Sequence, residues 1–292
     1  MDLRTLSYFV VIAEELNITK AAKILNMSQP PLSNQMKALE EELGTKLFIR
    51  GKRQLTLTEE GRYLYLKSKD ILGLVDKTSS EIKTMNNSLK GTISMGLVEG
   101  VAPEIAAKWI ADYRDQFPDI HFHIVDGNSD DLIERMRSGL ISLAVVTAPY
   151  DANFLNSIKI TDEKLGAFLR KDHPLAKEGR VLELRDLKPE QLIVPCRKAT
   201  SDNIRRWYRS IHSEPNIVCE VDNYLDAAAF VTQSIGIGIF PKTTSVFDSS
   251  IVCKDIIGVN TDIEYFFVWR KGHKLSVIEE NFIDYIKDFI RQ

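Results

Sequence analysis

Cysteine is scarce in this chain. Its 292 residues include only Cys196, Cys219 and Cys253, with no CxxC pair and no regular spacing among them. Zinc sites and disulfide frameworks need closely or regularly spaced cysteines, so the sequence predicts neither. We expect three reduced thiols that are mostly buried.

Long apolar runs are also missing. No stretch approaches the roughly 20 apolar residues that a membrane-spanning helix needs. The first residues do not combine a basic segment, an apolar core and a small-residue cleavage site, which together make an export signal. We therefore expect a cytoplasmic protein with no membrane partner.

The usual catalytic motifs are absent as well. The chain contains no GxSxG, P-loop, GxGxxG or HExxH pattern, and these patterns carry much of the known nucleophilic, phosphate, dinucleotide and zinc chemistry. His121 and His123 alternate along a predicted strand, which is more typical of a surface pair than of metal ligands. The sequence predicts no catalytic residue, no metal and no cofactor, and thus not an enzyme.

Two short helices joined by a tight turn are predicted between residues 17 and 43. Thr19 is the expected N-cap of the first helix, which carries adjacent alanines at positions 21 and 22. Ser28 is the expected cap of the second helix, with Pro30 and Pro31 in its first turn. The apolar stripe of this second helix consists of Leu32, Met36, Leu39 and Leu43. Gly44 is expected to end it.

The polar face of the second helix is suited to DNA. Gln29, Ser33, Asn34 and Lys37 lie away from the apolar stripe. Their amides, hydroxyl and ammonium group can hydrogen-bond base edges and phosphates. Two interpretations fit this pattern. One is a helix-turn-helix whose second helix enters the major groove of DNA, and the other is an ordinary helical hairpin with a polar face. The segment that follows favours the helix-turn-helix.

A cationic β-hairpin follows directly. Residues 46–50 and 54–58 alternate as strands around the turn Gly51-Lys52-Arg53. Arg50, Lys52 and Arg53 place positive charge at the tip, which suits a minor groove or a phosphate backbone. The net charge of the whole chain is −3. This combination favours site-specific binding over general coating of nucleic acid.

These segments resemble the LysR-type transcriptional regulators. The residues that carry the resemblance are LRTLSYFVVIAEELNITKAAKILNMSQPPLSNQMKALEEELGTKLFIR and LTLTEEGRYL. The resemblance implies that Gln29, Pro30, Ser33, Lys37, Arg50 and Arg53 face DNA. We add Thr19, Pro31, Asn34 and Lys52 as candidate contacts. Asn34 is a departure, because the family often has arginine there, so we do not carry over the family's usual contact at that point.

A long helix is predicted after the hairpin, from the cap residue Thr58 to about Asn87. Its seam alternates steps of four and three residues and consists of Leu64, Ser68, Ile71, Val75, Thr78, Ile82, Met85 and Leu89. Such a heptad seam favours a dimerisation helix, for which the candidates are Leu64, Ile71, Val75 and Ile82. An amphipathic helix packed on its own domain is the alternative. Two recognition helices that reach two half-sites also require a dimer.

Strands alternate with helices from residue 91 onward, which indicates an open, largely parallel α/β sheet with helices on both faces. The resemblance implies two regulatory subdomains, as in a periplasmic binding protein. The expected organisation is a winged helix-turn-helix domain (1–58), a linker helix (59–89), a first subdomain (91–162 and 268–292) and a second subdomain (163–267). The last helix is expected to pack on the first subdomain.

Ligands of open α/β sheets bind beyond the carboxyl ends of the strands. The residues expected at these positions are Glu99, Gly100, Val101, Asn128, Ser129, Thr147, Arg197, Thr200 and Asn223. Arg197 is the candidate for pairing with an anionic effector. Glu99 would repel a carboxylate, or would favour an effector with an amine or a hydroxyl. Individually, such residues also serve as helix caps and turn residues.

The sequence thus predicts a bacterial transcriptional regulator of the LysR type, switched by a small-molecule co-inducer. Its expected partners are double-stranded DNA with a pseudo-palindromic operator, the effector, and further copies of itself in a homodimer or homotetramer. RNA polymerase is a further candidate partner. Two alternatives stay open: a redox-sensing regulator that uses the three cysteines, and a cytoplasmic binding protein, which would leave the wing and the recognition helix unexplained.

Overall fold

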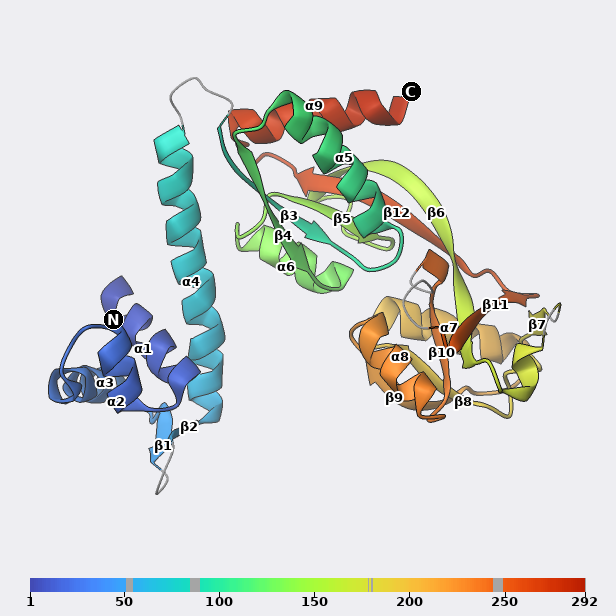
Figure 1. The fold of residues 1–292 in the computed structure, drawn as a ribbon, viewed down its shortest axis with the longest axis horizontal. Helices are drawn as coiled ribbons and strands as arrows, with labels where there is room; N and C mark the ends of the chain where they lie inside the picture. The colour runs from blue at the N-terminus through green and yellow to red at the C-terminus, as the bar shows by residue number, and fades with distance from the viewer. Residues whose placement is uncertain (51–54, 85–89, 178, 180, 244–248, 292) are drawn as a thin grey trace. The chain divides into compact units, whose positions relative to one another are not determined.

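Chain contacts divide the structure, a computed structural model, into two units (Figure 1): residues 1–83 and residues 84–292. It describes residues 1–50, 55–84, 90–177, 179, 181–243 and 249–291. Each unit has a hydrophobic core of its own.

Unit 1 contains three short helices, a two-stranded hairpin and a long helix. Its elements are α1 (Leu3–Glu15), α2 (Ile18–Ile24), α3 (Gln29–Leu43), β1 (Phe48–Arg50), β2 (Leu55–Leu57) and α4 (Glu59–Thr84). The strands β1 and β2 pair antiparallel, with Phe48 opposite Leu57. This arrangement is the predicted winged helix-turn-helix followed by a long helix.

The start of α2 differs from the sequence prediction. Asn17, and not Thr19, is the N-cap, because its side-chain oxygen accepts a hydrogen bond from the backbone N–H of Lys20 at 3.0 Å. Thr19 lies one position inside the helix and is exposed. Asparagine is as good a cap as any residue, and here it precedes the first helical residue.

The ends of α3 agree with the prediction. Ser28 is the residue before the helix, although its side chain makes no capping hydrogen bond. Pro30 and Pro31 lie in the first turn, where a missing N–H costs little. Gly44 ends the helix with a φ of +68°, a left-handed conformation that glycine adopts without a steric penalty.

The core of unit 1 holds the helix-turn-helix together. Phe9 of α1 and Leu32 of α3 are completely buried. Ala21 and Ala22 of α2 are also buried, and their small side chains let the neighbouring helices approach closely. Leu64 of α4 packs against the same core. The first turns of α4 are therefore part of this unit's own packing.

Glu40 joins α3 to the hairpin. Its carboxylate accepts hydrogen bonds from the backbone N–H groups of Leu47 at 2.9 Å and Phe48 at 3.3 Å, and from the Lys46 ammonium at 2.8 Å. Burial by itself would raise the pKa of Glu40, but these three donors outweigh it and hold the pKa below its ordinary value. The carboxylate thus fixes the point where the chain enters the wing.

The seam of α4 divides into two parts. Ser68 is fully buried, whereas Ile71 is 38% exposed and Ile82 is 63% exposed. Thr58 caps the helix, because its hydroxyl oxygen accepts a hydrogen bond from the Gly61 N–H at 2.9 Å. The expected seam residues Met85 and Leu89 lie outside the described residues. The apolar side chains beyond the first turns are thus available for another surface.

Unit 2 contains one mixed sheet. Its described strands are β3 (Gly91–Leu97), β4 (Ile120–Asp126), β5 (Leu143–Thr147), β6 (Leu155–Arg170), β7 (Leu182–Glu183), β8 (Gln191–Pro195), β9 (Asn216–Val221), β10 (Ile237–Pro241), β11 (Ile251–Ile257) and β12 (Asp262–Arg270). Their order is β4-β3-β5-β12-β6-β10-β8-β9, and β11 pairs with β6 and β7. The helices are α5 (Ala102–Gln116), α6 (Ser129–Arg137), the 3-10 helix η1 (Pro174–Ala176), α7 (Lys198–Ser210), α8 (Tyr224–Thr232) and α9 (Val277–Arg291).

The sheet is less parallel than predicted, because β6 and β12 carry the chain in opposite directions between two half-sheets (Figure 1). The first ten residues of β6 pair antiparallel with β12, and its later residues pair with β10 and β11. The strands β3, β4 and β5 are parallel to one another, as are β8, β9 and β10. The prediction of parallel βα units therefore applies within each half.

The chain returns to the first half-sheet earlier than expected. The sequence interpretation placed the return near Phe267, but β12 begins at Asp262 and pairs with β5 from Tyr265 onward. Tyr265 and Phe267 are both completely buried in the first core.

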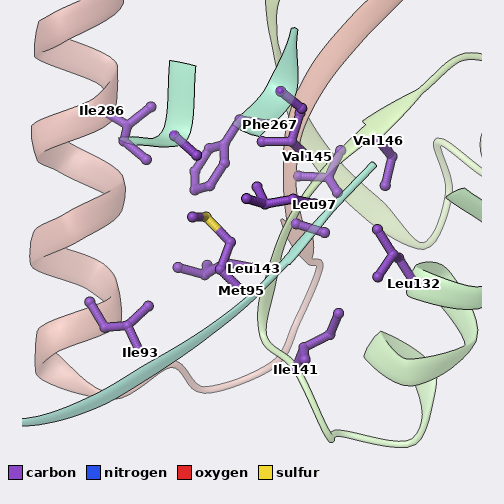
Figure 2. Close-up of a cluster of buried hydrophobic side chains, with 14 of the residues drawn as sticks. Ile93, Met95, Leu97, Leu132, Ile141, Leu143, Val145, Val146, Phe267 and Ile286 are labelled. Atoms are coloured by element: carbon purple, nitrogen blue, oxygen red, sulfur yellow. The ribbon is translucent and has the colours of Figure 1, made fainter. Parts of the chain in front are cut away.

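The first core fills both faces of the first half-sheet (Figure 2). Ile286 of α9 lies on the side of the strands toward which Phe267 points, and Leu132 of α6 lies on the other side. The Tyr113 hydroxyl of α5 donates a hydrogen bond to the Asn281 side chain of α9 at 2.7 Å. The closing helix therefore packs on the first half, as predicted. A second core, with Trp207 and Tyr208 of α7, fills the other half.

We predict that Glu40→Gln lowers the free energy of unfolding of unit 1 by about 1–3 kcal/mol, because it removes a charged acceptor from buried N–H groups. The pKa of Glu40 is lowered in the folded state, so its contribution is complete above the ordinary value of 4.5 and is lost as the pH falls through the folded-state value. Urea unfolding of the wild type and of Glu40→Gln between pH 7 and pH 3 measures the difference in free energy of unfolding. Hydrogen exchange at the Leu47 and Phe48 amides reports on the same contacts locally.

Lys46→Ala is the matched control. The Lys46 side chain is 74% exposed, so its loss should cost only about 0–1 kcal/mol. Equal losses in the two variants, or a difference that persists in acid, would contradict the role assigned to the buried carboxylate.

Candidate functional site

The exposed face of α3 carries the predicted DNA-contacting residues. Leu32, Met36 and Leu39 face the core, which leaves the intervening positions on the surface. The exposed residues among the candidates are Gln29, Pro30, Pro31, Asn34 and Lys37, with Ser33 half-buried. Thr19 is exposed on α2. Amide, hydroxyl and ammonium groups thus share one accessible helical surface, as major-groove readout requires.

The wing is described only at its base. Arg50 is the last residue of β1 and pairs across the hairpin with Leu55. Lys52 and Arg53, the other two candidate contacts of the wing, lie outside the described residues. Glu40 connects this base to α3, so the sequence interpretation missed a residue that sets the position of the hairpin. A glutamate within the apolar stripe pattern was the available signal.

Unit 2 contains a cavity of about 600 Å³ at the carboxyl ends of its strands. Loops after β3, β4, β8 and β9 supply most of the lining, together with the first turns of α7 and one side of β12. This volume lies within the usual range of small-molecule sites. The cavity occupies the place at which ligands of open α/β sheets bind.

Seven of the nine predicted effector residues line this cavity. They are Glu99, Asn128, Ser129, Thr147, Arg197, Thr200 and Asn223. Gly100 and Val101 are not among the lining residues. Instead, the Val101 N–H donates a hydrogen bond to the Glu163 carboxylate at 2.9 Å. Gly100 has a φ of +93°, and a Cβ there would lie 2.1 Å from the Tyr265 hydroxyl, so glycine is needed at this turn.

Arg197 reaches across the cavity to the first half of the unit. It is only 7% exposed and precedes the first residue of α7. Its guanidinium group donates hydrogen bonds to the Thr147 hydroxyl at 2.7 Å and to the Pro149 and Ala148 carbonyl oxygens at 2.7 and 3.3 Å. The Asp130 carboxylate lies 3.4 Å away. The sequence analysis predicted that Arg197 pairs with an anionic effector. In the structure, the N–H donors of Arg197 are already bonded to oxygen atoms of the chain itself.

Glu99 crosses the cavity in the opposite direction. Its carboxylate accepts a hydrogen bond from the Tyr224 N–H, at the start of α8, at 2.8 Å. Burial raises the pKa of Glu99 to about 7; the Tyr224 N–H opposes the rise, and the nearby Asp126 and Glu163 carboxylates add to it. Glu99 therefore changes its charge near neutral pH.

Tyr265 and Glu163 support the loop that carries Glu99, and neither was predicted. The Tyr265 hydroxyl donates a hydrogen bond to the Glu99 backbone carbonyl at 3.1 Å. The Glu163 carboxylate accepts hydrogen bonds from the Val101 and Thr243 N–H groups at 2.9 and 2.6 Å. Both residues come from the two crossing strands, so no local pattern in the sequence could connect them to residues 99–101.

The three cysteines are free. Burial raises the pKa of Cys196 to about 12, and its contact with the Asp222 carboxylate adds to the rise. Burial also raises the pKa of Cys253 to about 11. Because the thiolate is the reactive form of cysteine, these two environments suppress oxidation chemistry. Cys196 is exposed and Cys219 and Cys253 are half-buried, so the prediction of mostly buried thiols is wrong.

Two further observations concern the described part of the chain. Within it, no group of three or more His, Cys, Asp or Glu side chains is arranged to hold a metal ion. None of its helices combines the length and the apolar character needed to cross a membrane.

The comparisons with known proteins agree with both units. Residues 3–62 match a family described as "Bacterial regulatory helix-turn-helix protein, lysR family". Residues 86–291 match the "LysR substrate binding domain". The two matches cover nearly all of the described chain and divide it close to the boundary between the units.

Individual relatives match over most of their length. The uncharacterized HTH-type transcriptional regulator YybE of Bacillus subtilis (strain 168) is 28% identical over 98% of both chains. The HTH-type transcriptional regulator BsdA of the same strain is 31% identical over 83% of this chain and 84% of its own.

Among solved structures, CbnR, a LysR family transcriptional regulator, superimposes with a TM-score of 0.77, at 21% identity and over the whole of both chains. Full-length CbnR complexed with its target DNA gives a TM-score of 0.73, at 22% identity and 99% coverage of both chains. At these identities the two structures show that the fold is shared. From the two family matches, the chain belongs to the LysR family of bacterial transcriptional regulators, with a DNA-binding and an effector-binding domain.

Proposed function

We propose that a small molecule bound in the cavity of unit 2 changes how a dimer of this regulator holds a pseudo-palindromic operator. The observation that carries the proposal is the pair of contacts across the cavity, made by Arg197 and Glu99 in opposite directions. A ligand at this place must compete with or add to these contacts, so it changes the relative stability of two arrangements of the half-sheets. The coupling available to such a switch is typically about 1–3 kcal/mol.

The DNA side of the proposal is supported by the exposed polar face of α3. One such face can contact only one half-site of an operator, because each half-site accepts one recognition helix. Two copies are needed to reach two half-sites, which are about 34 Å apart or a multiple of that distance. Regulators of this kind act where the bacterial chromosome is, in the cytoplasm. RNA polymerase is the partner through which a change at the operator would affect transcription.

Dimerisation through α4 is supported by its exposed apolar side chains. Ile71 and Ile82 continue the heptad seam beyond the part that packs within unit 1. A helix of 26 residues whose seam is mostly apolar, interrupted by Ser68 and Thr78, gains most of its stability from packing against a partner. Pairing of two such dimers would give the expected homotetramer.

Redox sensing by the cysteines gains no support. The raised pKa values of Cys196 and Cys253 keep both thiols protonated at neutral pH. A solved structure of a Corynebacterium glutamicum OxyR C206 mutant is 25% identical to this chain with a TM-score of 0.59. That likeness does not extend to the reactivity of particular cysteines.

Selection of bound sequences from randomised DNA, with the full chain at fixed salt and no added ligand, tests the DNA-binding part of the proposal. We expect enrichment of an inverted repeat whose half-sites are spaced by whole helical turns. Enrichment of a single unrepeated half-site would contradict the dimer, and no enrichment would contradict sequence-specific binding.

Lys37→Ala should weaken operator binding and lower the slope of log K against log salt by about one, because one phosphate contact is lost. Fluorescence anisotropy with the selected operator at several salt concentrations measures both quantities. Lys108→Ala is the charge-matched control, since Lys108 is exposed on α5 of unit 2. An unchanged slope for Lys37→Ala would remove this residue from the DNA-contacting surface.

Ile71→Asp should convert the dimer to a monomer, because a carboxylate within an apolar seam would be buried without a partner. Sedimentation velocity of the full chain gives the oligomeric state. Leu66→Asp is the control: Leu66 is 62% exposed on α4 but lies outside the seam. An intact Ile71→Asp dimer would refute the seam, and equal dissociation of both variants would mean that any added charge on α4 has this effect.

A further inference from the structure

We propose that the ligand of the cavity carries a protonated amine, recognised by the Glu99 carboxylate. This inference rests on the proposed effector function and names the chemical class of the effector. It is argued from the charges around the cavity and from the hydrogen-bonding groups that the chain has already used there.

The cavity wall carries an excess of negative charge. Six carboxylates line it, against the two guanidinium groups of Arg197 and Arg206. The carboxylates are those of Glu99, Asp126, Asp131, Asp222, Asp262 and Glu264. Such a wall raises the local concentration of cations and repels anions.

Three of the groups around the cavity that would bind an anion already have partners in the chain. The Arg197 guanidinium donates to a hydroxyl and to two carbonyl oxygens and lies beside Asp130. The N-terminus of α8 donates its Tyr224 N–H to Glu99. At the N-terminus of α6, the Asn128 side chain accepts the N–H groups of residues 130 and 131. A carboxylate ligand at any of these three groups would have to displace a contact.

Carboxylate oxygens, in contrast, remain available. One Glu99 oxygen accepts the Tyr224 N–H, and no described residue bonds the other. Asp126 and Asp262 also have no partner among the described residues. Asp126 is close enough to Glu99 to raise the pKa of that carboxyl. A ligand ammonium at Glu99 would relieve this repulsion, and its own donors would satisfy the free oxygens.

The remaining wall suits an apolar stem. Val98, Leu165 and Ile263 line the cavity together with three proline rings, at positions 149, 195 and 241. A volume of about 600 Å³ admits an amine with several carbon atoms. Arg206 lies on the wall without a partner among the described residues, so the same ligand could be a simple amine or an amino acid whose carboxylate faces Arg206.

Isothermal titration calorimetry of the full chain tests the proposal with named probes. Putrescine and histamine represent simple amines, L-arginine and L-lysine represent amino acids, and succinate and benzoate represent anions. We expect at least one amine to bind and both anions to bind more weakly or not at all. If an anion binds more tightly than every amine, or if no amine binds, the proposal is wrong.

Glu99→Gln should weaken the binding of that amine about ten- to a hundredfold, the range for loss of a hydrogen bond to a charged group. Asp126→Asn is a second variant, at an exposed position, and should weaken binding in the same direction. Glu104→Gln is the control, because Glu104 is exposed on α5 and does not line the cavity. Equal affinity in the wild type, Glu99→Gln and Asp126→Asn would overturn the assignment.

The pH profile gives an independent readout. Because the pKa of Glu99 is about 7 in the free protein, amine affinity should rise as the pH increases through 7 and level off above it. The Glu99→Gln variant should lose this dependence. A wild-type affinity that does not change with pH would contradict recognition by Glu99.

The Arg206→Gln variant distinguishes a simple amine from an amino acid as the ligand. Arg206→Gln should weaken L-arginine or L-lysine and leave putrescine unchanged if the ligand is an amino acid. The DNA selection without ligand reports separately on the proposed function, so failure of the amine assignment and failure of the regulator assignment lead to different results.

Discussion

Two strands that cross between the half-sheets determine the shape of unit 2. The strands β6 and β12 pair over nine residues of β12, and every other strand of the unit belongs to one half or the other. Among the described strands, this ribbon joins the two halves, and side-chain contacts cross the cavity beside it. Arg197 and Glu99 make these contacts. The loop that carries Glu99 is itself supported by Tyr265 and Glu163 of the same ribbon.

The two contacts across the cavity have different electrostatic character. The Arg197 guanidinium is always charged, and most of its donors have neutral acceptors. The Glu99 carboxylate changes its protonation near neutral pH because it is buried among other carboxylates. A permanent and a titratable contact therefore hold the same opening.

The sequence predicted most of the elements and the edge of the sheet at which the cavity lies, because both depend on local patterns. The stripe of α3, its prolines and Gly44 specify one helix, and the cap residues after successive strands specify the edge of a sheet. The family resemblance added the division into two subdomains. Long-range partners were not predictable: the role of Arg197 depends on carbonyl groups about 50 residues away, and the point of return depends on which half-sheet Tyr265 joins. Thr19 was mistaken for a cap because both it and Asn17 suit that role.

The tie made by Glu40 has a consequence for how this regulator can diverge. A single carboxylate receives the backbone N–H groups at the base of the hairpin while it is held in the buried face of α3. The Glu40 carboxylate therefore couples the position of the hairpin base to that of α3. A substitution that tilts α3 also displaces the hairpin, so base preferences read by the two elements are inherited together.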